Sequence, residues 1–479
     1  MSQNNLSRTL TLSATISLVV GGVIGSGIFM KPAVMASQLG SPELLILVWI
    51  GAGFITLFGA LTNAEISAMI PETGGQYVFF QKMYGDFFAF MYGWAAFAVF
   101  NTGGVASIAY VFSTYFEYFI QLPRFSQEIE HSLQLTIPFI GHIYPLENFG
   151  VKFLTILLIS SLTAANYFST KFGGTIQIVF TVLKVGAMVL LVISAFLFGH
   201  GSFHNFTENS ATIIPSGFAL ISAIIAATVG AFWAYDGWNN ITFVSGEVQN
   251  PQKNIPKALL IGILTIIAVY VLINLAYLYI LPIDKIAQSG LVASDVATVV
   301  LGTIGGGFIA LLVIISTLGS TSANVLVVAR VSFAMAQENR FFKSAGKVHP
   351  KFETPANSLL IHAVWTNLLV LSGSFDLLTD MLIFVSWFFY AMSAIGVFVL
   401  RKKMSDAERP YKVWGYPVVP IIFISFSAFF LVITLFNDIS NYLNGTSPII
   451  NSLFGVFLTV IGLPFYLWFR RKGQVIRKS

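Results

Sequence analysis

The sequence contains no cysteine and few charged residues, and each shortage excludes functions. Without cysteine among its 479 residues, the chain can form no disulfide, thiolate metal site or cysteine redox centre. The six histidines are scattered and show no metal-ligand spacing. Charged residues make up 9% of the chain, against about 25% in soluble domains. We therefore expect an integral membrane protein that uses no metal or cofactor.

Hydrophobic residues dominate the composition of the chain. They account for 56% of the chain, and the mean hydropathy is +0.81. The sequence shows no cluster of acid/base residues of the kind that would indicate an enzyme. The net charge of +5 does not indicate nucleic-acid binding, because the basic residues lie in loops between apolar runs. The partners we expect are therefore small molecules and the lipid bilayer.

Twelve apolar runs are long enough to cross a bilayer, which takes about 20 residues. They cover residues 12–39, 43–70, 86–119, 151–170, 173–198, 216–245, 256–281, 297–336, 356–374, 377–400, 417–436 and 449–469. Between them, twenty Lys and Arg lie on the side of the N-terminus and three on the other, while Lys31 and Lys184 lie within runs. The positive-inside rule then predicts that both termini are cytoplasmic. We expect a multi-pass protein of the cell (plasma) membrane. We expect residues 1–479 to form one transmembrane domain.

The first run is interrupted by glycines at Gly25-Ser26-Gly27. A helix that opens there exposes the NH groups of Ser26 and Gly27, which attract a carboxylate, and carbonyls around Val23 and Ile24, which suit an ammonium group. The alternative is that the glycines only permit close helix packing. The pattern favours a site for a small zwitterion at the middle of the membrane.

The sixth run is also interrupted, by Asp236 and Gly237. Asp at a span centre usually marks a site, and Asp-Gly is a turn signal. Carbonyls around Phe232 and Ala234 are then available to an ammonium group. Two broken spans that lie five apart indicate an inverted repeat. We expect repeats over about residues 12–198 and 216–400, with two further helices over about 417–469.

Lys184 lies well inside the fifth run, where a lysine needs oxygen partners. Hydroxyls of Ser316, Thr317 or Ser320, or carbonyls freed by the first break, are candidates. Its ammonium group could then stand where another transporter holds a sodium ion. The alternative is that Lys184 extends to the membrane interface.

Other polar and aromatic residues have two readings each. Asp236 is predicted to cap the second half of the sixth span, although a protonatable coupling group is the alternative. Trp233 is placed as a lid beside the break, with plain packing as the alternative. Tyr270 and Asn274 either line the same cavity or pack. We expect Glu65 to be solvated or paired with a loop rather than to couple protons.

Several segments resemble the amino acid–polyamine–organocation transporter superfamily. Gly21–Phe29 is similar to its first-span motif G-x-x-I-G-S-G-I-F. Further segments look like its L-type amino acid transporter branch: Pro71–Tyr77, Tyr235–Asn239, Glu247–Pro251, Asn254–Ala258 and Arg409–Pro417. The matches extend from residue 16 to about residue 420.

The resemblance implies an all-α protein with a five-plus-five inverted-repeat (LeuT-like) fold, discontinuous helices 1 and 6, and two added C-terminal helices. It also implies carboxylate binding by Ser26 and Gly27, ammonium binding by carbonyls of Ile24 and Trp233, and a gate at Trp233. The predicted substrate-binding residues are Val23, Ile24, Gly25, Ser26, Gly27, Phe232, Trp233, Ala234, Tyr235, Gly237 and Tyr270. The predicted gating and coupling residues are Trp233, Lys184, Ser316 and Ser320.

The implied function is sodium-independent exchange of neutral L-amino acids by alternating access. Trp233 stands where many members have Phe and would shrink the pocket, which favours small substrates such as alanine and serine. Animal members pair with a glycoprotein through a disulfide, which a chain without cysteine cannot form, so a stand-alone, bacterial-type member is expected. A proton-coupled symporter of the same fold and a non-transporting amino acid sensor are the alternatives.

Overall fold

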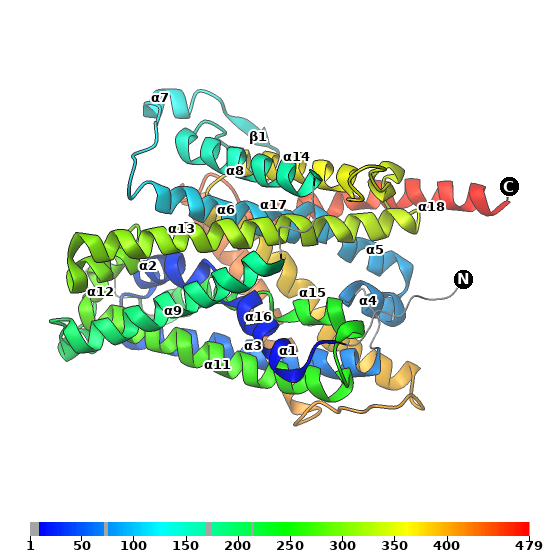
Figure 1. The fold of residues 1–479 in the computed structure, drawn as a ribbon, viewed down its shortest axis with the longest axis horizontal. Helices are drawn as coiled ribbons and strands as arrows, with labels where there is room; N and C mark the ends of the chain where they lie inside the picture. Colours follow the sequence, from blue (N-terminus) through cyan, green and yellow to red (C-terminus); the bar gives the residue numbers. More distant parts are fainter. Residues whose placement is uncertain (1–8, 71–74, 169–173, 212–214, 479) are drawn as a thin grey trace.

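The computed structural model describes residues 9–478 apart from 71–74, 169–173 and 212–214, and it describes no side chains for 174–184, 244 and 472–478. The fold is built almost entirely of helices, which run along the long axis of the molecule (Figure 1). A small antiparallel pair of strands, β1 (Leu135–Ile137) and β2 (Gly141–Ile143), lies in the loop between α6 and α8.

The helices follow one another without a second domain. In the first half they are α1 (Leu12–Val23), α2 (Gly27–Leu39), α3 (Pro42–Met69), α4 (Gln76–Tyr84), α5 (Asp86–Ala95), η1 (Ala96–Phe100), α6 (Asn101–Phe116), α7 (Gln127–Glu130), α8 (Phe149–Phe168), α9 (Gly174–Phe198) and η2 (Phe203–Phe206). In the second half they are α10 (Gly217–Tyr235), η3 (Trp238–Glu247), α11 (Pro251–Ile280), α12 (Ile283–Gln288), α13 (Val292–Gln337), η4 (Lys343–Gly346), α14 (Ala356–Ser372), α15 (Phe375–Lys403), α16 (Val418–Leu443), α17 (Asn451–Val460) and α18 (Gly462–Lys478).

Each of the twelve predicted apolar runs falls on a helix or on consecutive helices. Among the described residues, nine helical segments are long and apolar enough to cross a membrane, and the bent pair of α1 and α2 adds a tenth. Residues Val185–Phe198 of α9 and all of α14 are apolar but shorter. A multi-pass membrane protein is therefore confirmed.

Local sequence signals explain where the helices begin and end. Ser41 caps α3 by accepting the NH of Leu44, with Pro42 in the first turn. Gly40 ends α2 in the left-handed conformation that glycine adopts without steric cost. In the third predicted span, the π-helical turn η1 lies between α5 and α6. Its carbonyls at Phe97 and Ala98 accept hydrogen bonds from Thr102 and Trp365.

The most extensive helix pairings join segments that are far apart in the sequence. The three most extensive are α3 with α11, α6 with α13 and α2 with α10, followed by α9 with α13 and α1 with α11; α8 with α14 is a smaller pairing of the same kind. Buried apolar residues form two clusters, one centred on α1–α3, α10 and α11 and the other on α4–α6, α8, α14 and α15. Buried residues next to both interruptions, among them Ile24 and Tyr235, belong to the first cluster.

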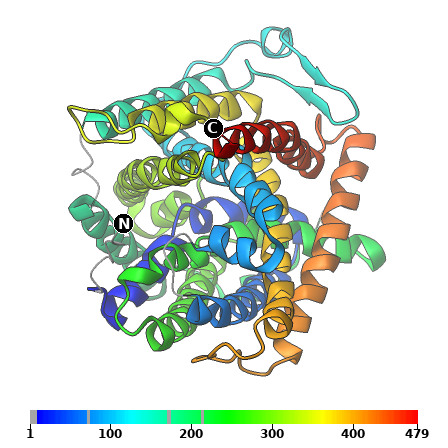
Figure 2. The same ribbon diagram turned by 90° about the vertical axis from the view of Figure 1, so that its right-hand side faces the viewer.

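The loops divide between the two ends of the molecule. The β1–β2 loop lies toward the end opposite the outward end of α18 (Figure 1). The end that carries α18 and α4 faces the viewer in Figure 2. There, Leu10 pairs with the segment after η3, because its NH donates to the Glu247 carbonyl at 3.0 Å and its carbonyl accepts the NH of Gln249 at 2.9 Å. The start of the described chain is thus tied to the end of the sixth predicted span.

Candidate functional site

The first predicted break is present where the glycines lie. Helix α1 ends at Val23, Ile24 has an extended backbone, and α2 starts at Gly27 after a bend of 45°. Ser26 precedes α2, and its hydroxyl Oγ is buried without a hydrogen-bond partner among the described residues. The N-terminus of a 13-residue helix and a buried hydroxyl therefore converge on one point. Such a point can bind a carboxylate through NH and OH donors.

The second predicted break is also present. Helix α10 ends at Tyr235, Asp236 is extended, and Gly237 has φ of +100°, after which the chain continues as the 3-10 helix η3. The positive φ is accessible to glycine without strain. The predicted capping role of Asp236 is wrong, because Gly237 precedes η3 and no side chain caps it. Asp236 instead accepts a hydrogen bond from the hydroxyl of Tyr390 on α15 at 2.7 Å.

The two breaks cross each other, and their backbones are in direct contact at the crossing. A Cβ placed on Gly27 would lie 2.6 Å from Cα of Ala234, and one on Gly237 would lie 2.8 Å from the carbonyl oxygen of Gly22. Real Cβ atoms do not come so close, so the crossing requires glycine at both positions. The two interruptions therefore form one site, contributed by two segments about 200 positions apart in the sequence.

Tyr270 on α11 joins the two breaks. Its hydroxyl lies 2.9 Å from the carbonyl oxygen of Ala234 and 3.2 Å from that of Val23. These are two of the carbonyls that the sequence offers to an ammonium group. Asn274, one turn further along α11, donates to the Tyr270 carbonyl at 2.8 Å and is fully buried. Tyr270 therefore contacts both breaks, while its predicted role in substrate binding stays a prediction.

The aromatic side chains next to the second break point in different directions. Tyr235 packs against Trp49 and Tyr270, and its hydroxyl donates to the Trp49 carbonyl at 3.0 Å. Phe232 turns away from the crossing and stacks on Trp387 of α15 with ring centroids 3.6 Å apart. Of Phe232, only the backbone can therefore serve the site. Trp233 packs edge-on against Phe375, and its indole NH is buried without a partner among the described residues.

The predicted coupling group around Lys184 stays a prediction. Lys184 belongs to α9, but its side chain lies outside the described residues. Ser316 and Ser320 lie on α13, which packs against α9, and Ser316 is buried. The helices are thus adjacent as the prediction needs, while the contact itself is not tested.

Sequence reasoning missed two ion pairs, each of which has one fully buried partner. Glu65 on α3 is fully buried. Its carboxylate accepts hydrogen bonds from two guanidinium nitrogens of Arg401, Nε and Nη2, and from the NH of Val413, each at 2.8 Å. Glu65 is therefore paired with a loop, as one reading expected, and is not solvated. Lys31 on α2 pairs with Asp376 on α15 at 2.6 Å. The available signal was a charged residue within each of two apolar runs, Lys31 and Glu65, and opposite charges at the two ends of a third, Asp376 and Arg401.

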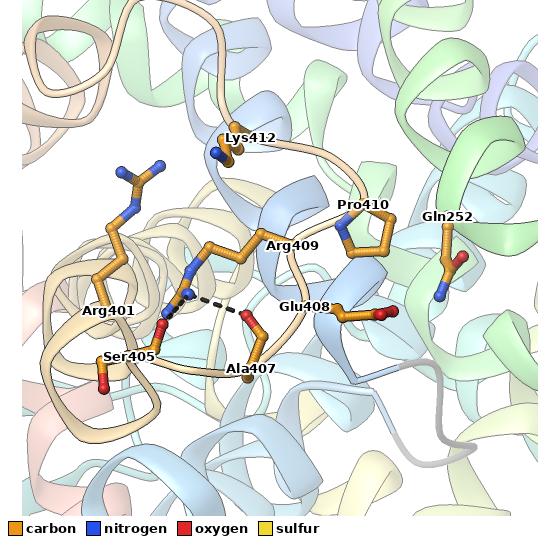
Figure 3. A pocket seen from close by; sticks show the side chains of 8 residues that line it. All are labelled: Gln252, Arg401, Ser405, Ala407, Glu408, Arg409, Pro410 and Lys412. Atoms are coloured by element: carbon orange, nitrogen blue, oxygen red, sulfur yellow. Dashed lines mark hydrogen bonds between the residues drawn. The ribbon is translucent and has the colours of Figure 1, made fainter.

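A surface cavity of about 720 Å³ lies at the connection from α15 to α16, away from the crossing. Its lining residues are Gln252, Arg401, Ser405, Ala407, Glu408, Arg409, Pro410 and Lys412 (Figure 3). Arg409 donates to backbone carbonyls of this loop, including those of Ser405 and Ala407. The guanidinium group therefore stabilises the loop that contains Val413, the residue bound to Glu65.

Two broken helices that cross inside a bundle of apolar helices are typical of one class of protein, the membrane transporters. The chain belongs to the amino acid permease family, whose sequence profile matches residues 10–461. It is an amino acid transporter rather than an enzyme, which confirms the resemblance noted in the sequence.

Individual relatives match nearly the whole chain. The serine/threonine exchanger SteT of Bacillus subtilis is 30% identical over 98% of this chain and 98% of its own length. The human b(0,+)-type amino acid transporter 1 is 28% identical over 97% of this chain and 88% of its own length. The human large neutral amino acids transporter small subunit 2 is 29% identical over 96% of this chain and 80% of its own length.

Proposed function

We propose that this protein is a sodium-independent exchanger of small neutral L-amino acids such as alanine and serine, which works by alternating access. The carboxylate of the amino acid is bound by the NH groups at the start of α2 and by the hydroxyl of Ser26. Its ammonium group is bound by carbonyls at the end of α1 and of α10. The observation that carries the proposal is the crossing of the two breaks, which brings donors and acceptors for a zwitterion to one point.

The proposed architecture has twelve spans, a five-plus-five inverted repeat and two added helices. Its support is the order of the helix pairings. Helices α2 and α10 belong to predicted spans 1 and 6, and α3 and α11 belong to spans 2 and 7. In the same way, α6 and α13 belong to spans 3 and 8, and α8 and α14 belong to spans 4 and 9; the two helices of each pair are in contact. Helices at equivalent positions of the two halves thus contact each other, which fits repeats of opposite orientation related by a two-fold axis.

We place the protein in the plasma membrane as a stand-alone subunit with both termini in the cytoplasm. The excess of Lys and Arg on one side of the spans supports this orientation. The absence of cysteine supports a chain that needs no disulfide-linked partner. The exchanger from Bacillus subtilis, with 30% identity, matches this chain over almost its full length.

The small side-chain pocket is proposed from Trp233. Its indole lies next to the second break and packs against Phe375 on α15, so it occupies space that a larger substrate side chain would need. Alanine and serine therefore fit better than leucine. The name of the Bacillus relative, an exchanger of serine and threonine, agrees with a small polar or apolar side chain.

Efflux from liposomes tests the proposal. Purified protein is reconstituted, the liposomes are loaded with labelled alanine, and each of the common amino acids is added outside in turn. We expect rapid efflux with alanine or serine outside, slow efflux with leucine, and no dependence on sodium. Efflux that is equally fast with no amino acid outside would contradict exchange, and faster efflux with leucine than with alanine would contradict the small pocket.

One observation favours proton-coupled symport as a second candidate. Asp236 is a carboxylic acid at the break itself and is hydrogen-bonded to Tyr390, so its protonation would alter a contact between α10 and α15. Uptake into liposomes without internal amino acid, driven by an inward proton gradient, distinguishes this candidate from exchange. If Asp236→Asn also retained exchange and lost only that uptake, Asp236 would be the coupling group.

A further inference from the structure

A second built site for an ammonium group lies one helical turn beyond the start of α2. The ammonium Nζ of Lys31 lies 2.6 Å from a carboxylate oxygen of Asp376, 2.8 Å from the hydroxyl of Thr379 and 3.7 Å from a carboxylate oxygen of Asp380. It also lies 4.8 Å from the ring centre of Phe375. Two carboxylates, a hydroxyl and an aromatic face are a full set of partners for a primary ammonium group. We call these four residues the α15 ammonium site.

The α15 ammonium site lies in the first turns of α15 and is stabilised by contacts with residues other than Lys31. Ser374 caps α15 by accepting the NH of Leu377, and carboxylates near a helix N-terminus are stabilised by the helix dipole. Asp380 also accepts a hydrogen bond from Asn451 on α17 at 3.3 Å. These contacts do not involve α2, so they do not depend on Lys31.

Lys31 reaches this site by crossing a third helix. A Cβ added to Gly230 of α10 would lie 3.3 Å from Cδ of Lys31, so the lysine stem passes directly over α10 at this glycine. Phe375 contacts both the ammonium group of Lys31 and the ring of Trp233. Lys31 therefore joins α2, α10 and α15 close to the crossing of the two breaks.

The ion pair lies at a boundary between protein and water. The side chain of Lys31 is 2% exposed, whereas that of Asp376 is 46% exposed. Water at Asp376 lowers the cost of separating the pair, because an accessible carboxylate can be solvated again. The pair thus combines a buried ammonium group with a carboxylate that water can reach.

We propose that Lys31, bound in the α15 ammonium site, closes the route between the crossing of the breaks and the end of the molecule at which α15 begins. When the lysine leaves the site, α2 separates from α15 and Ser26 becomes accessible from that end. The inference rests on the proposed alternating access, in which this end faces outward. It assigns to Lys31, Phe375, Asp376, Thr379 and Asp380 a gating role that is separate from substrate binding.

The natural absence of cysteine makes a direct test possible. Ser26→Cys places one thiol at the crossing, and a membrane-impermeant thiol reagent is added outside intact cells. We expect Lys31→Met and Asp376→Asn each to raise the labelling rate by on the order of tenfold, since either removes one partner of the pair. Lys152→Met is the matched control, because Lys152 is also buried and donates to the Tyr144 carbonyl on another part of the fold. The control should leave the rate unchanged.

Chemical rescue separates gating from damage to the fold. Lys31→Ala leaves the α15 ammonium site open to a free primary ammonium ion, so millimolar ethylamine should return the labelling rate of Ser26→Cys toward that of the parent. Ethanol should have no effect, and neither should ethylamine after Asp376→Asn and Asp380→Asn are added. If Lys31→Ala is not monodisperse in size-exclusion chromatography, labelling of the Asp376→Asn protein decides instead.

Unchanged labelling of the Lys31→Met and Asp376→Asn proteins would overturn the inference, as would an equal increase in the Lys152→Met control. A monodisperse Lys31→Ala protein whose fast labelling ignores ethylamine would overturn it as well. The assay needs no transport. If the Ser26→Cys proteins label as expected but the parent protein, with Ser26 intact, moves no amino acid, the proposed exchange would be refuted and the gate retained.

Discussion

The hydroxyl of Tyr270 lies 2.9 Å from the carbonyl oxygen of Ala234 and thereby connects α11 to the end of α10. The same hydroxyl lies 3.2 Å from the carbonyl oxygen of Val23, at the end of α1. The hydroxyl of Tyr270 therefore lies within hydrogen-bond distance of two carbonyls. An ammonium group with three NH donors could also bind these carbonyls. Tyrosine and substrate are expected to compete for the same acceptors.

Tyr270→Phe removes the hydroxyl and leaves both carbonyls without this donor. We expect the ligand-free protein to lose about 1–3 kcal/mol, the cost of an unsatisfied buried acceptor. Alanine should restore part of that loss, so the shift of the melting temperature caused by alanine should be larger than in the parent. Tyr277→Phe is the control, because its hydroxyl lies 3.5 Å from the nearest carbonyl, that of Ile28. A smaller shift in Tyr270→Phe would mean that the hydroxyl binds the substrate.

Gly237→Ala should be strongly destabilising. The residue has φ of +100°, and a Cβ would lie 2.8 Å from the carbonyl oxygen of Gly22. Backbone strain alone costs about 1–3 kcal/mol, and the clash adds to it. Gly22→Ala is the matched control, since its Cβ would be 3.8 Å from the Gly237 carbonyl oxygen and alanine favours the helix. Thermal unfolding of both proteins in detergent should show a large loss only for Gly237→Ala.

Trp233→Phe should change which amino acids are exchanged. A smaller ring beside the second break enlarges the pocket, and one or two carbon atoms in such a pocket alter selectivity by about tenfold or more. We expect the ratio of leucine to alanine exchange to rise by roughly that factor in liposomes. Trp387→Phe is the control, because Trp387 stacks on Phe232 away from the crossing. An unchanged ratio in Trp233→Phe would leave Trp233 as a packing residue.

Glu65→Gln should destabilise the protein without altering substrate choice. The carboxylate is fully buried and is bound by two nitrogens of Arg401 and by the NH of Val413. Removing one partner of a buried pair costs about 3–5 kcal/mol. Glu408→Gln, at an exposed position of the neighbouring loop, should cost less than about 0.5 kcal/mol. Equal melting temperatures of the two variants would show that the Glu65 pair contributes little.

Several features could be predicted because they depend on local chemistry. Gly25-Ser26-Gly27 and Asp236-Gly237 interrupt apolar runs, and the structure has its breaks at both positions. The capping role of Asp236 could not be judged in this way, because Tyr390, which binds its carboxylate, is 154 positions away. The direction of Phe232 was equally hidden, since its stacking partner lies on α15.

The sequence by itself determined the class of protein, the apolar runs and the places where two of them break. These follow from composition and from the conformational preferences of glycine within a single segment. Only the tertiary structure decided that Gly27 meets Ala234, that Tyr270 joins both breaks and that Lys31 reaches Asp376. Such contacts depend on how helices far apart in the chain pack, because a buried charge or carbonyl takes the partner that packing brings within reach.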